Sequence, residues 1–251
     1  MKKRDRHPGN LAGKRVLITG AAKHIGREIA LAMAAAGADV AVTYLNSKDH
    51  ADELVEEIRR RGTKAQALYC DVREEGSVTK AVTQAAGALG GLDILVNNAA
   101  RYETVELARL TVAQWDEMFN INVRGPFLVS RACMPHLKKS RGRIINLGSL
   151  GGVRPWVTHA HYCQSKAALH MQTQLLAKAY AREIAVNCVA PGMIDLQEKP
   201  ASEVLRKIAK KTPMQRNGTS ADVAAAVMFF AATPHFITGQ ILLVEGGLNL
   251  A

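Results

Sequence analysis

The sequence lacks the features that mark membrane, secreted and metal-binding proteins. No apolar run reaches the roughly 18 residues that a membrane helix needs. The basic start is followed by Asn10-Leu-Ala-Gly13, not by the apolar stretch of an export signal. The histidines show no H-E-x-x-H spacing, and the four cysteines stand far apart, at Cys70, Cys133, Cys163 and Cys188. We therefore expect a cytoplasmic protein with reduced thiols, no bound metal and no membrane association.

Acidic residues are scarce relative to basic ones. The 251 residues carry 33 Lys and Arg against 22 Asp and Glu, a formal charge of +11. Residues 1–15 hold six basic residues and one acid, so five of the eleven excess charges lie there. We interpret residues 1–12 as a basic tail and 13–251 as a single domain, and we expect no nucleic-acid partner. The alternative, a polyanion-binding protein, predicts that removal of residues 1–10 abolishes binding to nucleic acid.

What the chain has in abundance is alternation of short β-branched runs with longer helical patterns. Strands are predicted at 15–19, 39–44, 64–69, 92–96, 143–147, 185–189 and 240–244. Helices are predicted near 24–36, 47–61, 74–89, 111–139, 156–182 and 219–232. Helical crossovers join parallel strands and cover both faces of their sheet. The sequence thus predicts an α/β fold: a single-domain, Rossmann-type, doubly wound, seven-stranded parallel sheet with helices on both faces.

Two segments interrupt this alternation. Gly125-Pro126 stands inside an otherwise helical stretch and predicts that the helix ends or kinks there. The connection over 190–213 is long and contains Pro191-Gly192 and a polar, helical piece over 201–211. Long connections in compact domains are usually functional, so this one is a candidate lid.

A glycine-containing turn, Thr19-Gly-Ala-Ala-Lys-His-Ile-Gly26, follows the first strand and opens the first helix. Glycine allows close approach of the backbone, and the amides at a helix start attract phosphate. This context favours a pyrophosphate site, although a plain strand-to-helix turn would have the same residues.

The end of the second strand indicates which dinucleotide binds. NAD sites usually carry an acid there for the ribose hydroxyls. This chain reads Thr43-Tyr-Leu-Asn-Ser47 instead, without a carboxylate to repel a 2′-phosphate. Asn46, Ser47 and the nearby Lys23 offer hydrogen bonds and positive charge. We therefore predict NADP(H) in preference to NAD(H).

Tyr162 and Lys166 are four residues apart, which places them on one face of a helix. A nearby cation favours the phenolate and brings the pKa of a tyrosine toward neutrality. Tyr162 is therefore a candidate proton donor to a carbonyl oxygen while a hydride reaches its carbon. Asn97-Asn-Ala-Ala100 and Gly148-Ser149 follow predicted strands, at the sheet edge where such folds bind ligands.

Together these segments resemble the short-chain dehydrogenase/reductase family over about residues 12–249. The matching pieces are Thr19-Gly-x-x-x-x-x-Gly26, Cys70-Asp-Val72, Asn97-Asn-Ala99, Asn122, Ser149, Tyr162-x-x-x-Lys166, Pro191-Gly192, Thr238-Gly-Gln240 and Glu245-Gly-Gly247. The resemblance implies four catalytic residues: Asn122, Ser149, Tyr162 and Lys166. It implies cofactor binding by Gly20, Lys23, His24, Ile25, Gly26, Asn46, Ser47, Asp71, Val72, Asn98, Ala99, Tyr162, Lys166, Pro191, Gly192 and Ile194.

The resemblance also implies individual roles. Tyr162 would be the acid–base residue, Ser149 would hydrogen-bond the substrate oxygen, and Lys166 would bind the nicotinamide ribose. Asn122 would hold a water that links Lys166 to solvent. The remaining matches would contact the cofactor: Asp71 and Val72 its adenine, Asn98 the ribose region on the adenosine side, and Pro191, Gly192 and Ile194 the nicotinamide.

One departure resembles the pteridine reductase branch of that family. His24 stands where most members have a second glycine, and that branch has a basic side chain there. Tyr102 would match an aromatic residue that stacks on the pterin, whereas Ser149 stands where the branch commonly has Asp. Candidate substrate contacts are Tyr102, Trp156, His159, Met193 and Leu196, with His161 beside them.

The sequence therefore predicts an NADP(H)-dependent oxidoreductase acting on a carbonyl or alcohol group of a small molecule. Reduction of a pteridine or dihydrofolate, reduction of a 3-oxoacyl thioester, and NADP(H) binding without turnover remain alternatives. The resemblance also implies a homo-oligomer, with a tetramer favoured. The apolar end of the chain, 240–251, is consistent with an interface.

Overall fold

The computed structural model describes residues 10–196 and 202–251. Residues 1–9 of the predicted tail and 197–201 of the predicted lid lie outside the described residues. Seven strands form one parallel sheet in the order β3-β2-β1-β4-β5-β6-β7. They are β1 (Arg15–Ile18), β2 (Asp39–Tyr44), β3 (Ala65–Tyr69), β4 (Ile94–Asn97), β5 (Arg143–Leu147), β6 (Ala185–Pro191) and β7 (Ile241–Val244). This confirms the predicted Rossmann-type sheet.

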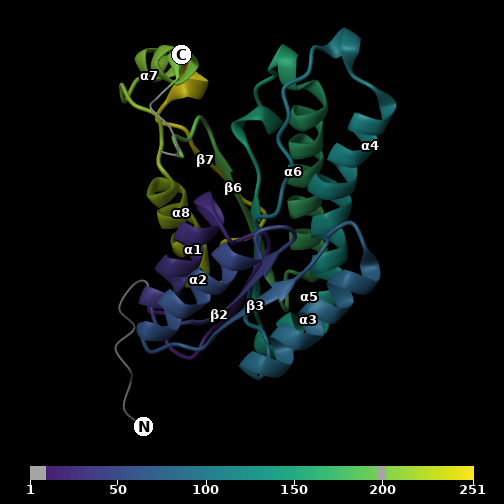
Figure 1. Cartoon of the computed structure of the whole chain (residues 1–251), viewed down its shortest axis with the longest axis vertical. Helices are drawn as coiled ribbons and strands as arrows, with labels where there is room; N and C mark the ends of the chain where they lie inside the picture. Colours follow the sequence, from purple (N-terminus) through teal and green to yellow (C-terminus); the bar gives the residue numbers. More distant parts are fainter. Residues whose placement is uncertain (1–9, 197–201) are drawn as a thin grey trace.

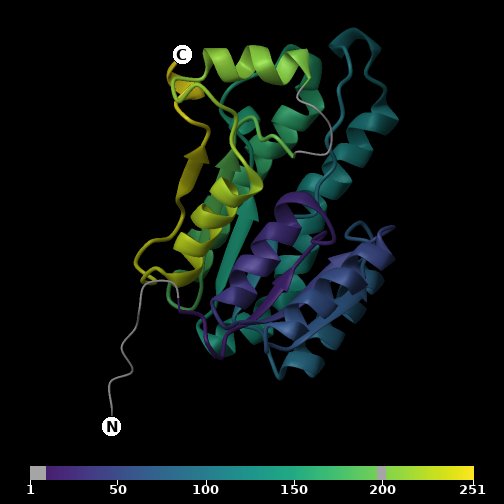
Figure 2. The same ribbon diagram turned by 60° about the vertical axis from the view of Figure 1, so that its left-hand side comes forward.

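Helices cover both faces of the sheet (Figure 1). One layer holds α1 (His24–Ala35), α2 (Lys48–Arg60) and α8 (Ser220–Ala232). The opposite layer holds α3 (Glu75–Leu89), α4 (Val112–Phe119), α5 (Gly125–Ser140) and α6 (Ala160–Tyr180). The polar piece of the candidate lid forms α7 (Glu203–Lys211), which lies beyond the carboxyl ends of the strands (Figure 2).

The strands are apolar along their length because both of their faces are buried. In β1, Val16 and Ile18 pack into the core under α1, α2 and α8, whereas Leu17 points into the core under α3 and α5. Parallel sheets covered on both sides require such continuous apolar runs. The two cores together fix the sheet and therefore fix where its carboxyl edge lies.

The helix predicted over 111–139 is interrupted, as Gly125-Pro126 suggested. α4 ends at Phe119, a π-helical turn spans Asn120–Arg124, and α5 begins at Gly125. Pro126 has no amide hydrogen for the carbonyl of Asn122, and the amide of Gly125 instead reaches the carbonyl of Asn120. The wider turn places Asn122 in the interior, fully buried.

The segments that follow β1, β4, β5 and β6 meet at the carboxyl edge. They carry the glycine turn, Asn98, Ser149 and Gly192, respectively. The topology thus gathers residues that are far apart in the sequence, as expected for an open parallel sheet.

Candidate active site

The turn after β1 is locked against the end of β4. The side-chain amide of Asn98 donates to the carbonyl oxygens of Thr19 and Gly20, both at 2.9 Å. Gly20 has a left-handed φ of 61°, and a Cβ there would lie 2.9 Å from the Cα of Ala99. A Cβ at Gly26 would lie 2.5 Å from Nδ2 of Asn98. Both glycines are therefore required by geometry, and the Asn98 amide is engaged in holding the turn.

His24 adopts the left-handed conformation that glycine takes more easily, with a φ of 52°. It is exposed and forms the first residue of α1, next to Lys23. Left-handed histidine is uncommon, and such residues cluster at functional sites. The turn accepts a side chain at this position, as the sequence departure required.

A cavity of about 450 Å³ opens beside this turn. Its predicted lining residues are Gly20, Lys23, His24, Ile25, Gly26, Asp71, Val72, Asn98, Ala99, Tyr102 and Leu196. The sequence reasoning missed Tyr44, Leu45, Cys70, Arg73, Ala100 and Ile121. Asn46 and Ser47 follow Leu45 in the chain but are not in the lining. The volume lies within the range of small-molecule and cofactor sites.

The carboxylate of Asp71, the residue predicted to contact adenine, is paired with Arg73. Its guanidinium donates to both carboxylate oxygens of Asp71, at 2.6 to 3.1 Å, and to Glu117 at 2.7 Å. These hydrogen bonds from Arg73 hold the pKa of Asp71 below its usual range. The Asp71 carboxylate is thus ionised and already paired. The only sequence signal was an arginine two residues after the motif aspartate.

Lys166 lies one turn after Tyr162 on α6 and is buried. Its Nζ donates to the carbonyl oxygen of Leu147 at 2.7 Å and lies 5.7 Å from the centre of the Tyr162 ring. Burial lowers the pKa of Lys166 to about 8 and raises the pKa of Tyr162 to about 12. The predicted lowering of the Tyr162 pKa by Lys166 does not appear in this structure: burial is the largest cause of the shift, and Lys166 is not among its causes. Tyr162 is protonated at neutral pH, as a proton donor must be.

Ser149 stands next to the phenol. It is buried and extended, and its Oγ accepts a hydrogen bond from the amide of Gly151 at 3.0 Å. A hydrogen bond with Ser149 opposes the rise of the Tyr162 pKa. The two hydroxyls are therefore close enough to interact, and an oxygen atom of a substrate placed between them would receive hydrogen bonds from both.

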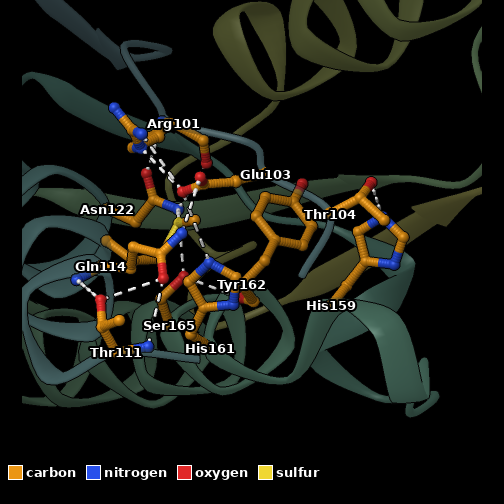
Figure 3. A network of polar contacts seen from close by, with 11 residues as sticks. Arg101, Glu103, Thr104, Thr111, Gln114, Asn122, His159, His161, Tyr162 and Ser165 are labelled. Atoms are coloured by element: carbon orange, nitrogen blue, oxygen red, sulfur yellow. Dashed lines mark hydrogen bonds and ion pairs between the residues drawn. The ribbon is translucent and has the colours of Figure 1, made fainter. Parts of the chain in front are cut away.

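The side chain of Asn122 connects the segment after β4 to α6 (Figure 3). Its Oδ1 accepts from the amide of Arg101 at 2.8 Å, and its Nδ2 donates to the carbonyl of Arg101 and to Oγ of Ser165. The side chain is thus fully engaged. The predicted water would therefore have to bind elsewhere; Pro126 leaves the Asn122 carbonyl without its α-helical donor.

Tyr102 and His159 join the two loops on the open side of Tyr162. Their rings stack at 4.9 Å, and the Tyr102 hydroxyl lies 2.6 Å from Nε2 of His159. Tyr102 also meets Tyr162 edge to face at 5.0 Å, and Trp156 lies edge-on to His159 at 5.9 Å. Tyr102 is 56% exposed, so part of its ring is open to the cavity.

The remaining predicted pocket residues do not all line the cavity. His161 is fully buried, with Nε2 3.9 Å from a carboxylate oxygen of Glu103, so it is not a pocket residue (Figure 3). Leu196 lines the cavity, whereas Met193 uses its carbonyl to hold Gly218 at 2.9 Å.

The segment predicted to contact the nicotinamide is held by β7. The amide of Gly192 donates to the carbonyl of Val244 at 2.9 Å, and a Cβ at Gly192 would lie 2.6 Å from the Cβ of Glu245. Ile194 forms a single parallel bridge with Gly218. These contacts hold the 191–194 segment in place at the end of β6, next to Leu150.

Two further features are absent from residues 10–196 and 202–251. This part of the chain holds no group of three His, Cys, Asp or Glu side chains placed to share a metal ion. None of its helices combines the length and apolarity needed to cross a membrane.

Known proteins resemble this chain over nearly its whole length. The family model described as enoyl-(acyl carrier protein) reductase matches residues 20–249. A 3-oxoacyl-[acyl-carrier-protein] reductase of Staphylococcus epidermidis is 35% identical over 94% of this chain and 99% of its own. The short chain dehydrogenase mdpC of Emericella nidulans is 35% identical over 96% of this chain and 97% of its own.

Solved structures agree with these relatives. A short chain dehydrogenase from Burkholderia cenocepacia in complex with NADP is 39% identical, with a TM-score of 0.91 over 96% of this chain and 99% of its own. A blue fluorescent protein from a metagenomic library in complex with NADPH is 36% identical, with a TM-score of 0.90 over 95% and 99%.

Proposed function

Because the chain belongs to the short-chain dehydrogenase/reductase family of oxidoreductases, we propose that it interconverts a carbonyl compound and its alcohol with NADP(H). The observation that carries the proposal is the interacting pair of hydroxyls of Ser149 and Tyr162, with the buried Lys166 5.7 Å from the centre of the Tyr162 ring. Binding of a dinucleotide without turnover needs no such proton donor.

The residues at the turn fit a dinucleotide. Gly20, Lys23, His24, Ile25 and Gly26 line the cavity where α1 begins, and the start of a helix favours the negative charge of a phosphate. Gly20 to Gly26 would hold the pyrophosphate, Val72 the adenine, and Lys166 with the 191–194 segment the nicotinamide side. NADPH, when bound, supplies the hydride.

The chain itself supplies proton transfer and orientation. The Tyr162 hydroxyl donates its proton to the substrate oxygen as negative charge develops there, and the Ser149 hydroxyl hydrogen-bonds the same oxygen. In the reverse direction Tyr162 takes the proton of the alcohol. Lys166 holds the ribose and supplies positive charge near the phenol once it is protonated.

A preference for NADP(H) is supported by the charge around the adenosine end. The Tyr44–Ser47 segment carries no carboxylate, and Lys23 and His24 border the same cavity. A 2′-phosphate would meet hydrogen-bond donors and positive charge there rather than repulsion. Two similar structures are complexes with NADP and NADPH.

Two observations favour two different classes of substrate. The relatives named 3-oxoacyl-[acyl-carrier-protein] reductase favour a 3-oxoacyl thioester. The open ring of Tyr102 beside Tyr162 favours a flat ring such as a pterin. Ser149 in place of an acid counts against the pterin, so the thioester is the better candidate.

Assembly as a homotetramer in the cytoplasm is also part of the proposal. Large apolar side chains are exposed on two separate faces: Phe127, Met171 and Leu175 on α5 and α6, and Phe229 and Leu242 on α8 and β7. Contiguous exposed apolar surface commonly marks an interface. Light scattering of the purified protein tests this, and a monomer in dilute buffer would contradict it.

The enzymatic proposal is tested by NADPH oxidation with acetoacetyl thioesters, simple diketones, dihydrobiopterin and dihydrofolate, with NADH in parallel. Tyr162→Phe removes the proton donor, so we expect turnover to fall about 1,000-fold while NADPH binding stays within about twofold. Unchanged turnover in this variant would refute the assigned acid. Tyr180→Phe, on the same helix, serves as the control.

A further inference from the structure

A second buried titratable side chain stands behind the proposed catalytic pair. His170 lies one helical turn after Lys166 on α6 and is only 5% exposed. None of the steps proposed above uses it. Burying an imidazole costs free energy unless its polar atoms are hydrogen-bonded, so we expect this side chain to have a role.

The ring of His170 fills space that two glycines leave open. A Cβ at Gly148 would collide with its Nε2, and a Cβ at Gly152 would lie 2.5 Å from its Cε1. These glycines flank Ser149, so the loop 148–152 wraps around the imidazole. The shape of the loop and the presence of the ring depend on each other.

The ring also contacts the backbone of Ser149 directly. The amide of Ser149 donates to Nε2 of His170 at 3.4 Å, a long hydrogen bond. Acceptance at Nε2 requires that the ring proton sit on Nδ1. Nδ1 is buried and has no hydrogen-bond partner among the described residues. Burial of the unpartnered Nδ1 costs free energy, and the hydrogen bond that the ring does form is to the loop that carries the proposed catalytic serine.

Burial makes His170 a weak base and so a poor group for direct proton transfer. Burial, with the positive charge of Lys166 as a smaller cause, lowers the pKa of His170 to about 4. The ring is therefore neutral at every pH where the enzyme would work. Its contribution has to come from position rather than from charge.

We propose that His170 is a positioning residue that fixes the backbone of Ser149 and thereby aims the Ser149 hydroxyl at the oxygen that Tyr162 protonates. This rests on the proposed function. The imidazole acts as a hydrogen-bonding wedge: its volume sets the loop 148–152, and its Nε2 holds the amide at the centre of that loop. A Leu at this position would keep most of the volume and lose the acceptor, whereas a Gln would keep an acceptor at similar reach.

A double-mutant cycle tests the proposal. We expect His170→Leu to lower kcat about tenfold, with NADPH affinity unchanged, and His170→Gln to restore at least half of the loss on a logarithmic scale. In a Ser149→Ala background, His170→Leu should change kcat less than twofold, because its effect passes through Ser149. An equal tenfold loss in that background, or a Gln variant as slow as the Leu variant, would overturn the proposal.

A second measurement is independent of turnover. Amide hydrogen exchange in 147–153 should be at least threefold faster in His170→Leu than in the wild type, and close to wild type in His170→Gln. Equal exchange in all three proteins would overturn the positioning role. If no carbonyl compound is reduced by the wild type but the loop responds as expected, the proposed function fails and the loop contact stands.

Discussion

The cofactor cleft and the substrate side of this molecule are built in different ways. The cleft is made of backbone: Gly20 and Gly26 leave room, and Asn98 ties the turn to the end of β4. The substrate side is made of side chains from separate loops, such as Tyr102 stacked on His159. Cofactor binding should therefore respond to added atoms, and substrate chemistry to lost contacts.

The two regions meet at Lys166, so its removal should disturb both. For Lys166→Ala we expect kcat to fall about 100-fold and the Kd for NADPH to rise about tenfold, because one ammonium serves the ribose and the phenol. Steady-state kinetics and fluorescence titration measure the two effects. Lys178→Ala, on the exposed side of α6, is the control. A purely kinetic defect would show that the ribose role is wrong.

Adding one methyl group in each region should impair NADPH binding in the cofactor cleft and turnover on the substrate side. Gly26→Ala places a Cβ against Asn98, so we expect the Kd for NADPH to rise about 30-fold with little change in kcat at saturation. Gly152→Ala places one against His170, so we expect kcat to fall about tenfold with NADPH affinity retained. Gly87→Ala, in α3 with open space around it, is the control. Identical defects in the first two variants would end the distinction.

The buried imidazole of His170 should also make the folded protein less stable in acid. Its folded pKa of about 4 lies below the ordinary value of 6.5, so the unfolded chain binds the proton more strongly. His170 thus contributes no penalty above pH 6.5, and stability is lost as the pH falls from 6.5 toward 4. Relative to pH 7, we expect about 2 kcal/mol of loss from this group at pH 5. Urea unfolding of His170→Gln should show that much less acid sensitivity; an identical loss would contradict the assignment.

The smallest effect is expected at the adenosine end. Asn46→Asp adds a carboxylate near the proposed 2′-phosphate, so the ratio of kcat/KM for NADPH to that for NADH should fall about tenfold. Asn46→Ser keeps the neutral charge and should leave the ratio nearly unchanged. If the wild type already prefers NADH, the predicted coenzyme is wrong.

The same contrast explains what could be predicted from sequence. The seven strands, to within two residues at each end, the glycine turn and the break before Pro126 follow from local rules of backbone geometry, and the structure has each of them. The pairing of Arg73 with Glu117 and the wedge made by His170 depend on which segments meet in space. Periodicity does not encode such contacts. The burial that raises the Tyr162 pKa was missed for the same reason, since it depends on neighbours from other loops.

The most direct test joins the two regions by measuring the ionisation of Tyr162 with and without NADP⁺. Ultraviolet difference titration of the wild type against Tyr162→Phe isolates this one phenol. Without NADP⁺ we expect a pKa of about 12, set by burial. With NADP⁺, whose nicotinamide side Lys166 and the 191–194 segment would hold, the added positive charge should lower this pKa by about two units or more, because a nearby cation favours the phenolate. The same pKa in both titrations would contradict the proposal that Lys166 and the 191–194 segment hold the nicotinamide side of the cofactor next to Tyr162.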